Sequence, residues 1–127
     1  MGFMAPDAVI DKALEDVALS DRLYVCSDEP TSFTEASSTQ NLATIILTAG
    51  KGNGDWTIGN GDTSGRKLTI AEQAGTGTTT GTATHVAFGV NGSSTLKFVC
   101  TLTSMLIQAG VAFTIPSKDV WEIRDPS

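Results

Sequence analysis

Two strand-like segments joined by an Asn-Gly dipeptide constrain the fold of this chain more than any other feature of its sequence. Residues 82–90 and 95–102 both carry the β-branched and aromatic side chains that favour strands, and Asn91-Gly92 lies between them. Asn-Gly between two such runs is the strongest short-range signal for an antiparallel hairpin. The sequence therefore predicts that these segments form neighbouring antiparallel strands.

Further strand-like segments recur along the chain at the spacing that is typical of β-sandwiches and barrels. They span residues 22–27, 43–48, 67–70, 111–115 and 120–123. Turn signals separate them, and the composition agrees, because 18 Thr and 13 Gly accompany a charged fraction of only 17%. We therefore predict a mainly β chain, with an antiparallel β-sandwich or barrel in residues 21–127 as a single domain.

A short helix is predicted ahead of the strands, over residues 6–19. Pro6 and Asp7 suit the first turn of a helix, and apolar residues then recur at helical spacing. This apolar stripe could pack on the chain's own sheet or on another subunit. We expect residues 1–20 to form an N-terminal arm and helix that dock on a partner. The candidate docking residues are Phe3, Met4, Val9, Ile10, Leu14 and Val17.

A second, shorter helical segment is predicted within residues 31–38. Thr31 or Ser32 precedes Glu35 at the spacing of a capping box, in which two side chains satisfy backbone N–H groups at the start of a helix. This segment follows the strand at residues 22–27 and interrupts the β pattern.

The glycine-rich segment of residues 50–65 repeats Gly-Asn-Gly-Asp at residues 52–55 and 59–62. Gly and Asn favour tight turns, so we interpret it as two turns that flank a short strand. A contact loop for a partner is the alternative, with the candidate residues Asn53, Asp55, Trp56, Asn60 and Asp62. The segment lacks the ligand pattern of a calcium loop and the Gly-Lys-Thr/Ser ending of a phosphate loop, so we predict no metal and no cofactor.

The net charge of −6 lies entirely in the first third of the chain. Residues 1–40 hold eight acidic and two basic side chains, whereas residues 41–127 hold six of each. The basic residues are scattered apart from Arg66-Lys67, so we predict no nucleic-acid partner. The acidic third is either a solvated face or a docking surface for a basic partner.

No residue pattern in the chain predicts an enzyme. His85 is the only histidine, and neither Cys26 nor Cys100 stands in a metal-binding or nucleophile motif. We interpret the cysteines as buried free thiols, with a disulfide as the alternative if their strands are neighbours. Residues 1–20 have no signal-peptide pattern, and no apolar stretch approaches the ~20 residues of a membrane span. We therefore expect a protein that is made in the cytoplasm and does not bind membranes.

Short phrases spread over most of the chain resemble small virion proteins of tailed bacteriophages. They are Met-Gly-Phe-Met-Ala-Pro and Leu-Tyr-Val-Cys-Ser-Asp-Glu-Pro-Thr near the start, and then residues 64–67, 82–87, 109–115 and 123–127. The resemblance implies a non-enzymatic capsid decoration (cement) protein on the exterior of the virion shell, where it stabilises contacts between capsomers. Its implied partners are the major capsid protein and copies of itself, as a homotrimer. The alternatives are a small tail or neck component and a host-recognition (receptor-binding) module, in which residues 50–65 would be the contact loop.

Overall fold

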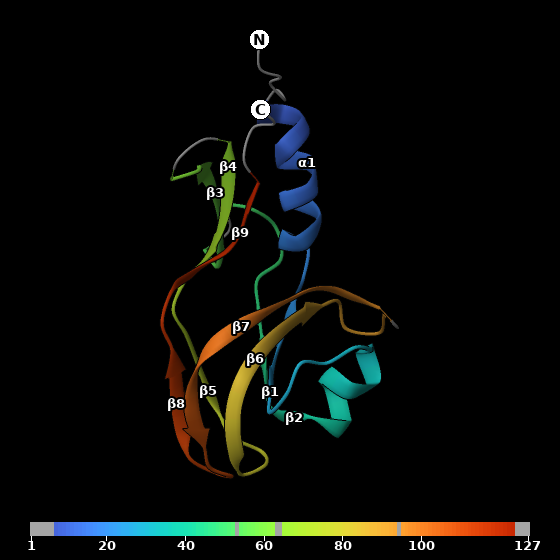
Figure 1. Cartoon of the computed structure of the whole chain (residues 1–127), viewed down its shortest axis with the longest axis vertical. Coiled ribbons are helices and arrows are strands. Elements are labelled where there is room, and N and C mark those ends of the chain that lie inside the picture. Colours follow the sequence, from blue (N-terminus) through green and yellow to red (C-terminus); the bar gives the residue numbers. More distant parts are fainter. Residues whose placement is uncertain (1–6, 53, 63–64, 94, 124–127) are drawn as a thin grey trace.

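The computed structural model describes residues 7–52, 54–62, 65–93 and 95–123 (Figure 1). Its elements are α1 (Asp7–Ala18), β1 (Arg22–Cys26), η1 (Glu35–Thr39), β2 (Asn41–Ile46), β3 (Trp56–Asn60), β4 (Arg66–Ile70), β5 (Gln73–Thr76), β6 (Gly81–Gly89), β7 (Leu96–Ile107), β8 (Ala112–Ile115) and β9 (Lys118–Ile123). All pairings between these strands are antiparallel. The prediction of a mainly antiparallel β chain with a short N-terminal helix is confirmed.

The strands form three sheets, with the orders β2-β1-β6-β7, β3-β4-β9 and β5-β8. Figure 1 shows β6 and β7 side by side as the two longest ribbons of the molecule. They form the predicted hairpin, in which Phe88 lies opposite Phe98 and Gly92 takes a φ of 86° at the turn. β7 extends beyond the predicted end at residue 102, because its second half pairs with the start of β6 and brings Ile107 opposite Gly81.

One hydrophobic core joins the helix to the strands. Leu14 of α1 and Leu68 of β4 are both fully buried in it, together with Val25 of β1 and Ile115 at the end of β8. A helix with one apolar face must bury that face against another element, and here the strands supply the surface. The helix therefore helps to build the same core as the sheets.

The apolar stripe of α1 packs on the chain's own strands, which corrects the docking prediction for most of its members. The exposed fractions are 4% for Ile10, 0% for Leu14 and 3% for Val17. Side chains that are buried this fully have no surface left to offer a partner. Val9 is 63% exposed and remains a candidate docking residue. The two other candidates, Phe3 and Met4, lie outside the described residues.

The segment between β1 and β2 covers the opposite face of the four-stranded sheet. Its Phe33 and Ala36 pack around Tyr24, Cys26 and Ala87, which form a second, smaller apolar cluster. The Tyr24 and Phe33 rings meet edge to face, with centroids 5.7 Å apart. The second predicted helical segment is therefore confirmed as η1, and it closes the sheet on this side.

Hydrogen bonds among the residues of the predicted capping box, Thr31, Ser32 and Glu35, shape the turn that leads into that helical segment. The Glu35 N–H donates a hydrogen bond of 3.2 Å to Ser32 Oγ. Glu35 Oε1 in turn accepts hydrogen bonds of 2.7 Å from both the N–H and the hydroxyl of Thr31. The Glu35 carboxylate therefore binds the residue before Ser32 instead of the Ser32 N–H, and the bonds satisfy two backbone donors of this turn.

Candidate docking surfaces

Trp56, a member of the candidate contact loop, is a core residue. It is 0% exposed, and its Nε1–H donates a hydrogen bond of 3.2 Å to the Ser20 carbonyl oxygen. Its ring meets that of Phe88 edge to face, with centroids 5.1 Å apart. A buried Trp needs a partner for its N–H, and the backbone between α1 and β1 supplies it. The prediction that Trp56 contacts a partner is therefore wrong.

The polar members of the candidate contact loop hold the turns of their own chain. Asp55 accepts hydrogen bonds from the Thr48 N–H at 2.6 Å and from Gln73 Nε2 at 2.9 Å. Asn60 Oδ1 accepts one of 2.9 Å from the Arg66 guanidinium. Asp62 accepts one of 2.8 Å from the Lys67 ammonium group.

These bonds support the interpretation of residues 50–65 as turns on both sides of a short strand, which is β3. Gly52 and Gly54 take φ angles of 76° and 106° on its N-terminal side. Asn53 lies outside the described residues. A role of Asn60 and Asp62 as partner contacts remains a prediction, since both side chains are exposed.

The acidic side chains of α1 pair with basic residues from distant parts of the chain. Asp11 binds Arg66 of β4 through two contacts, of 2.9 Å to Nε and 3.3 Å to a terminal nitrogen. Two further pairs join Glu15 to Lys51 and Asp16 to Lys97. The acidic face of the helix is therefore neither purely solvated nor free for a basic partner, because it attaches α1 to the strands and to the turn before β3.

Cys26 and His85 lie directly opposite each other on β1 and β6. Burial raises the pKa of the Cys26 thiol to about 12, so the thiol stays protonated at neutral pH. Its Sγ lies 3.7 Å and 3.8 Å from two carbonyl oxygens, those of Tyr24 and Ala36. His85 Nδ1 lies 2.9 Å from the Thr84 hydroxyl. The pair does not hold the thiolate that nucleophilic catalysis needs.

Both cysteines are free thiols, and the alternative of a disulfide is wrong. Cys26 is on β1 and Cys100 is on β7, and β6 lies between these two strands in the sheet.

Within the described part of the chain, no group of three or more His, Cys, Asp or Glu side chains could hold a metal ion. No helix among the described residues is both long enough and apolar enough to cross a membrane.

Two segments at the end of the molecule that is farthest from the start of α1 carry no formal charge. Residues 73–84 and 101–117, here called the neutral end, contain no Asp, Glu, Lys or Arg. They form β5, β8, the start of β6 and the end of β7, which gather at the lower end of Figure 1. The Gly110 N–H donates a hydrogen bond of 2.8 Å to the Gly77 carbonyl oxygen, and the Ala109 N–H donates one of 3.1 Å to Thr80 Oγ1.

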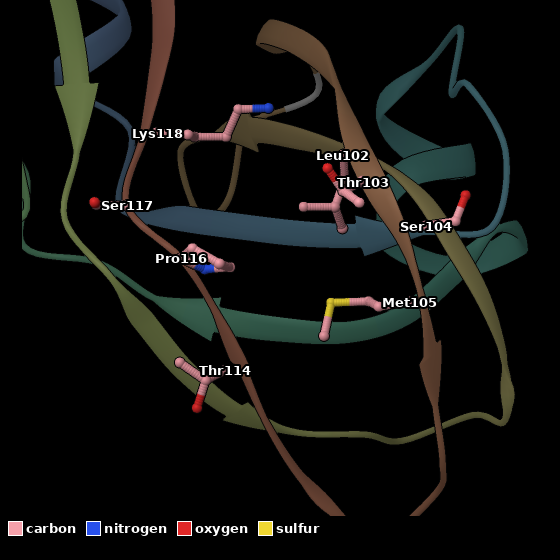
Figure 2. A pocket seen from close by; sticks show the side chains of 8 residues that line it. All are labelled: Leu102, Thr103, Ser104, Met105, Thr114, Pro116, Ser117 and Lys118. Carbon is pink, nitrogen blue, oxygen red and sulfur yellow. The ribbon is translucent and has the colours of Figure 1, made fainter.

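A groove of about 360 Å³ opens on this neutral end, between β7 and the chain that leads from β8 into β9. Figure 2 shows its lining side chains, which are Leu102, Thr103, Ser104, Met105, Thr114, Pro116, Ser117 and Lys118. Residues 102–104 line it because the register of β6 and β7 shifts there, from His85 opposite Thr101 to Ala83 opposite Met105. Such irregularities at a sheet edge redirect side chains. The Lys118 ammonium group bridges the two sides by donating a hydrogen bond to the Thr101 carbonyl oxygen.

Comparison of the chain with protein-family models, curated proteins and solved structures finds no match. Local sequence patterns predict no docking surface at the neutral end. Two long segments without a charged residue nevertheless mark it in the sequence, although each segment by itself predicts only turns and strands.

Proposed function

We propose that this chain is a non-enzymatic virion structural protein of a tailed bacteriophage, and specifically a capsid decoration (cement) protein. It binds the outside of the shell as a homotrimer, contacts the major capsid protein and stabilises the junctions between capsomers. The observation that carries the proposal is the resemblance of phrases spread over most of the chain to small virion proteins of these phages. It needs no cofactor, nucleic acid or membrane.

The mechanics of the fold support this proposal. A protein that reinforces a shell against internal pressure needs a stiff body, because a loose one would yield before it transmits force. Here antiparallel sheets share one core with α1, and the bidentate Asp11–Arg66 pair fixes the helix to β4. The paired side chains of Asp11 and Arg66 are only 15% and 20% exposed, so solvent screens this pair less than an ordinary surface pair.

The end that carries the start of α1 is the proposed capsid-facing end. Val9 on this helix is 63% exposed, and Phe3 and Met4 precede it in the sequence. Apolar side chains of this kind supply the buried anchors of a specific interface, which covers about 1,600 Å² in a typical complex.

Quantitative mass spectrometry of purified particles tests the proposal directly. The copy number of this chain is measured against that of the major capsid protein in the same particles. A decoration protein approaches the copy number of the capsid protein. A few copies per particle would instead favour a tail, neck or host-recognition component, and absence from the particle would refute a virion role.

A second experiment tests the capsid-facing end. The double variant Phe3→Ser/Met4→Ser is incubated with particles stripped of this protein, and binding is followed by co-sedimentation. We expect binding to fall by at least about tenfold, since two apolar anchors are lost. The control is Leu19→Ser, which removes a 52% exposed apolar side chain from just beyond the other end of α1. Unchanged binding of the double variant would contradict the assignment of this end.

A further inference from the structure

We infer that the neutral end is the surface through which copies of this chain contact one another. The inference deepens the proposed function, since it rests on the part of that proposal in which the chain acts as an oligomer. It assigns the copy–copy interface to residues 73–84 and 101–117 and leaves the opposite end of the molecule for the capsid.

The distribution of charge favours a second copy as the occupant of this surface. Each copy carries a net charge of −6, and none of the charged residues belongs to the neutral end. If two copies met through the other surfaces, their charged side chains would come close together. The net charge of −6 on each copy would then make the contact repulsive overall. If two copies meet through their neutral ends, their charged side chains stay far apart. Salt screens the interactions between charges that are separated by more than about 8 Å.

The exposed side chains of the neutral end have the composition of an interface core. Leu106 is 59% exposed and Val111 is 49% exposed, and the exposed Ala109 and Ala112 lie close to Val111 in the sequence. Interface cores are depleted in charged residues, whereas an ordinary soluble surface has about 25–35% of them. The neutral end has none.

The polar side chains of the neutral end suit a surface that binds its own copy. The exposed polar groups are almost all hydroxyls, and they belong to Thr76, Thr78, Thr79, Thr80, Thr82, Thr101, Thr103, Ser104, Thr114 and Ser117. A hydroxyl both donates and accepts hydrogen bonds, so it can pair with the same group on another copy. A surface of ammonium groups or carboxylates cannot do this, and a symmetric interface requires a self-complementary patch.

The strand edges at the neutral end are also unprotected by charge. β7 is an edge strand of the four-stranded sheet, and β8 is an edge strand of the two-stranded sheet. Proteins usually guard such edges with lysine or proline, because an open edge pairs with other chains. Lys118 covers the Thr101 carbonyl oxygen, but residues 103–106 beyond it carry no charge. These residues offer an edge to a second copy.

The neutral end is held in shape before any copy binds. The Gly77 carbonyl oxygen accepts a hydrogen bond of 2.8 Å from the Gly110 N–H, and the Gly77 N–H donates one of 3.1 Å to the Val111 carbonyl oxygen. The Thr78 N–H and hydroxyl both donate to the Leu42 carbonyl oxygen, at 2.8 Å and 3.0 Å. A surface that is already ordered loses little conformational entropy on association, which favours binding.

Sedimentation equilibrium of the purified full-length chain tests the inference, from micromolar to near-millimolar concentration. We expect an oligomer for the wild type. Leu106→Glu and Val111→Glu each place one charge on the neutral end, and we expect each to weaken association by at least about tenfold. The matched control is Leu19→Glu, which places the same charge on a 52% exposed apolar position just beyond α1 and should leave association unchanged.

The outcomes separate this inference from the proposed function. A monomeric wild type overturns the inference, and so does an oligomer that both neutral-end variants preserve. An oligomer dissociated by Leu19→Glu alone would place the interface outside the neutral end. Circular dichroism confirms that each variant is folded, and two independent variants guard against the failure of one. The copy number in particles is measured separately and does not depend on any of these results.

Discussion

Gly77 lies where the chain leaves β5, and the backbone of the turn between β7 and β8 leaves no room for a side chain there. A Cβ at residue 77 would lie 2.3 Å from the Gln108 carbonyl oxygen and 2.8 Å from Ile107 Cγ2. Backbone cannot move aside as a flexible side chain can, so we expect Gly77→Ala to lower the free energy of unfolding by about 1–3 kcal/mol. Urea denaturation monitored by tryptophan fluorescence measures the change.

Gly59 of β3 provides the matched control for this prediction. A Cβ added there would meet no atom within 4 Å. Gly59→Ala should therefore raise the free energy of unfolding by about 0.4–1 kcal/mol, because alanine restricts the unfolded chain more than glycine does. Equal effects of the two variants would show that the contact between residues 77 and 108 is not tight in solution.

The buried thiol of Cys26 makes a second prediction at this scale. Since desolvation raises its pKa to about 12, we expect its alkylation by iodoacetamide near neutral pH to be at least about a hundredfold slower in the folded protein than in denaturant. Peptide mass spectrometry measures the two rates. Rapid alkylation of the folded protein at Cys26 would contradict the packing of residues 27–40 over this face of the sheet.

The raised pKa of the Cys26 thiol makes the stability of the fold depend on pH in the alkaline range. The folded pKa of Cys26 lies above the value of about 8.5 for an exposed thiol, so the unfolded chain loses its proton first as the pH rises. The stability that burial of the neutral thiol contributes is therefore complete below about pH 8.5 and declines above it.

At the scale of elements, Glu35 ties the helical segment η1 to the turn before it. Hydrogen bonds from the N–H and hydroxyl of Thr31 hold the pKa of the Glu35 carboxyl below its ordinary value. A lowered pKa means that the stabilising effect is complete above the usual pKa of glutamate, about 4.3, and is lost as the pH falls through the folded value. Glu35→Gln should therefore lose less thermal stability than the wild type between about pH 7 and about pH 3.

Thermal unfolding at both pH values measures this difference. Glu72→Gln is the control, because it removes the same charge from an exposed position between β4 and β5. If Glu35→Gln lost as much thermal stability as the wild type between the two pH values, the ionised Glu35 carboxylate would contribute nothing to the stability of this turn.

The sequence predicted those elements whose signals are local. The hairpin at Asn91-Gly92 and the helix that starts near Asp7 were predictable because turn chemistry and helical periodicity are properties of neighbouring residues. β5 was missed because Gly75 and Thr76 belong to a Gly/Thr run without an apolar pattern. It becomes a strand only through its pairing with β8, where Ala74 lies opposite Thr114.

At the scale of the whole molecule, periodicity could not show which surface each apolar face would meet. Ile10 and Leu14 stand at helical spacing whether the partner is the chain's own sheet or another subunit. Trp56 lies in a glycine-rich segment, where its aromatic side chain suits either a core position or a partner contact, and its packing against Phe88 decides for the core. The ion pair between Asp11 and Arg66 joins residues far apart in the sequence, so no local pattern predicts it.

The placement of α1 in the shared core leads to a prediction about truncation. A chain of residues 21–127 lacks the helix and leaves bare the strand surfaces that Ile10, Leu14 and Val17 cover. Burial of one large aliphatic side chain contributes roughly 1.5–3 kcal/mol, and a domain is stable by only about 5–15 kcal/mol. The loss of three such side chains therefore approaches the whole stability of the fold.

We expect the 21–127 chain to lose cooperative unfolding in urea and the near-ultraviolet circular dichroism of its buried Trp56. The control chain begins at Pro6 and keeps α1, so it should unfold at the midpoint of the full-length protein, although it lacks Phe3 and Met4. This control also separates the two roles predicted for residues 1–20, because a helix that only docks on a partner could be removed without harm to the fold. Cooperative unfolding of the 21–127 chain at an unchanged midpoint would show that the β domain is independent and that α1 serves the partner.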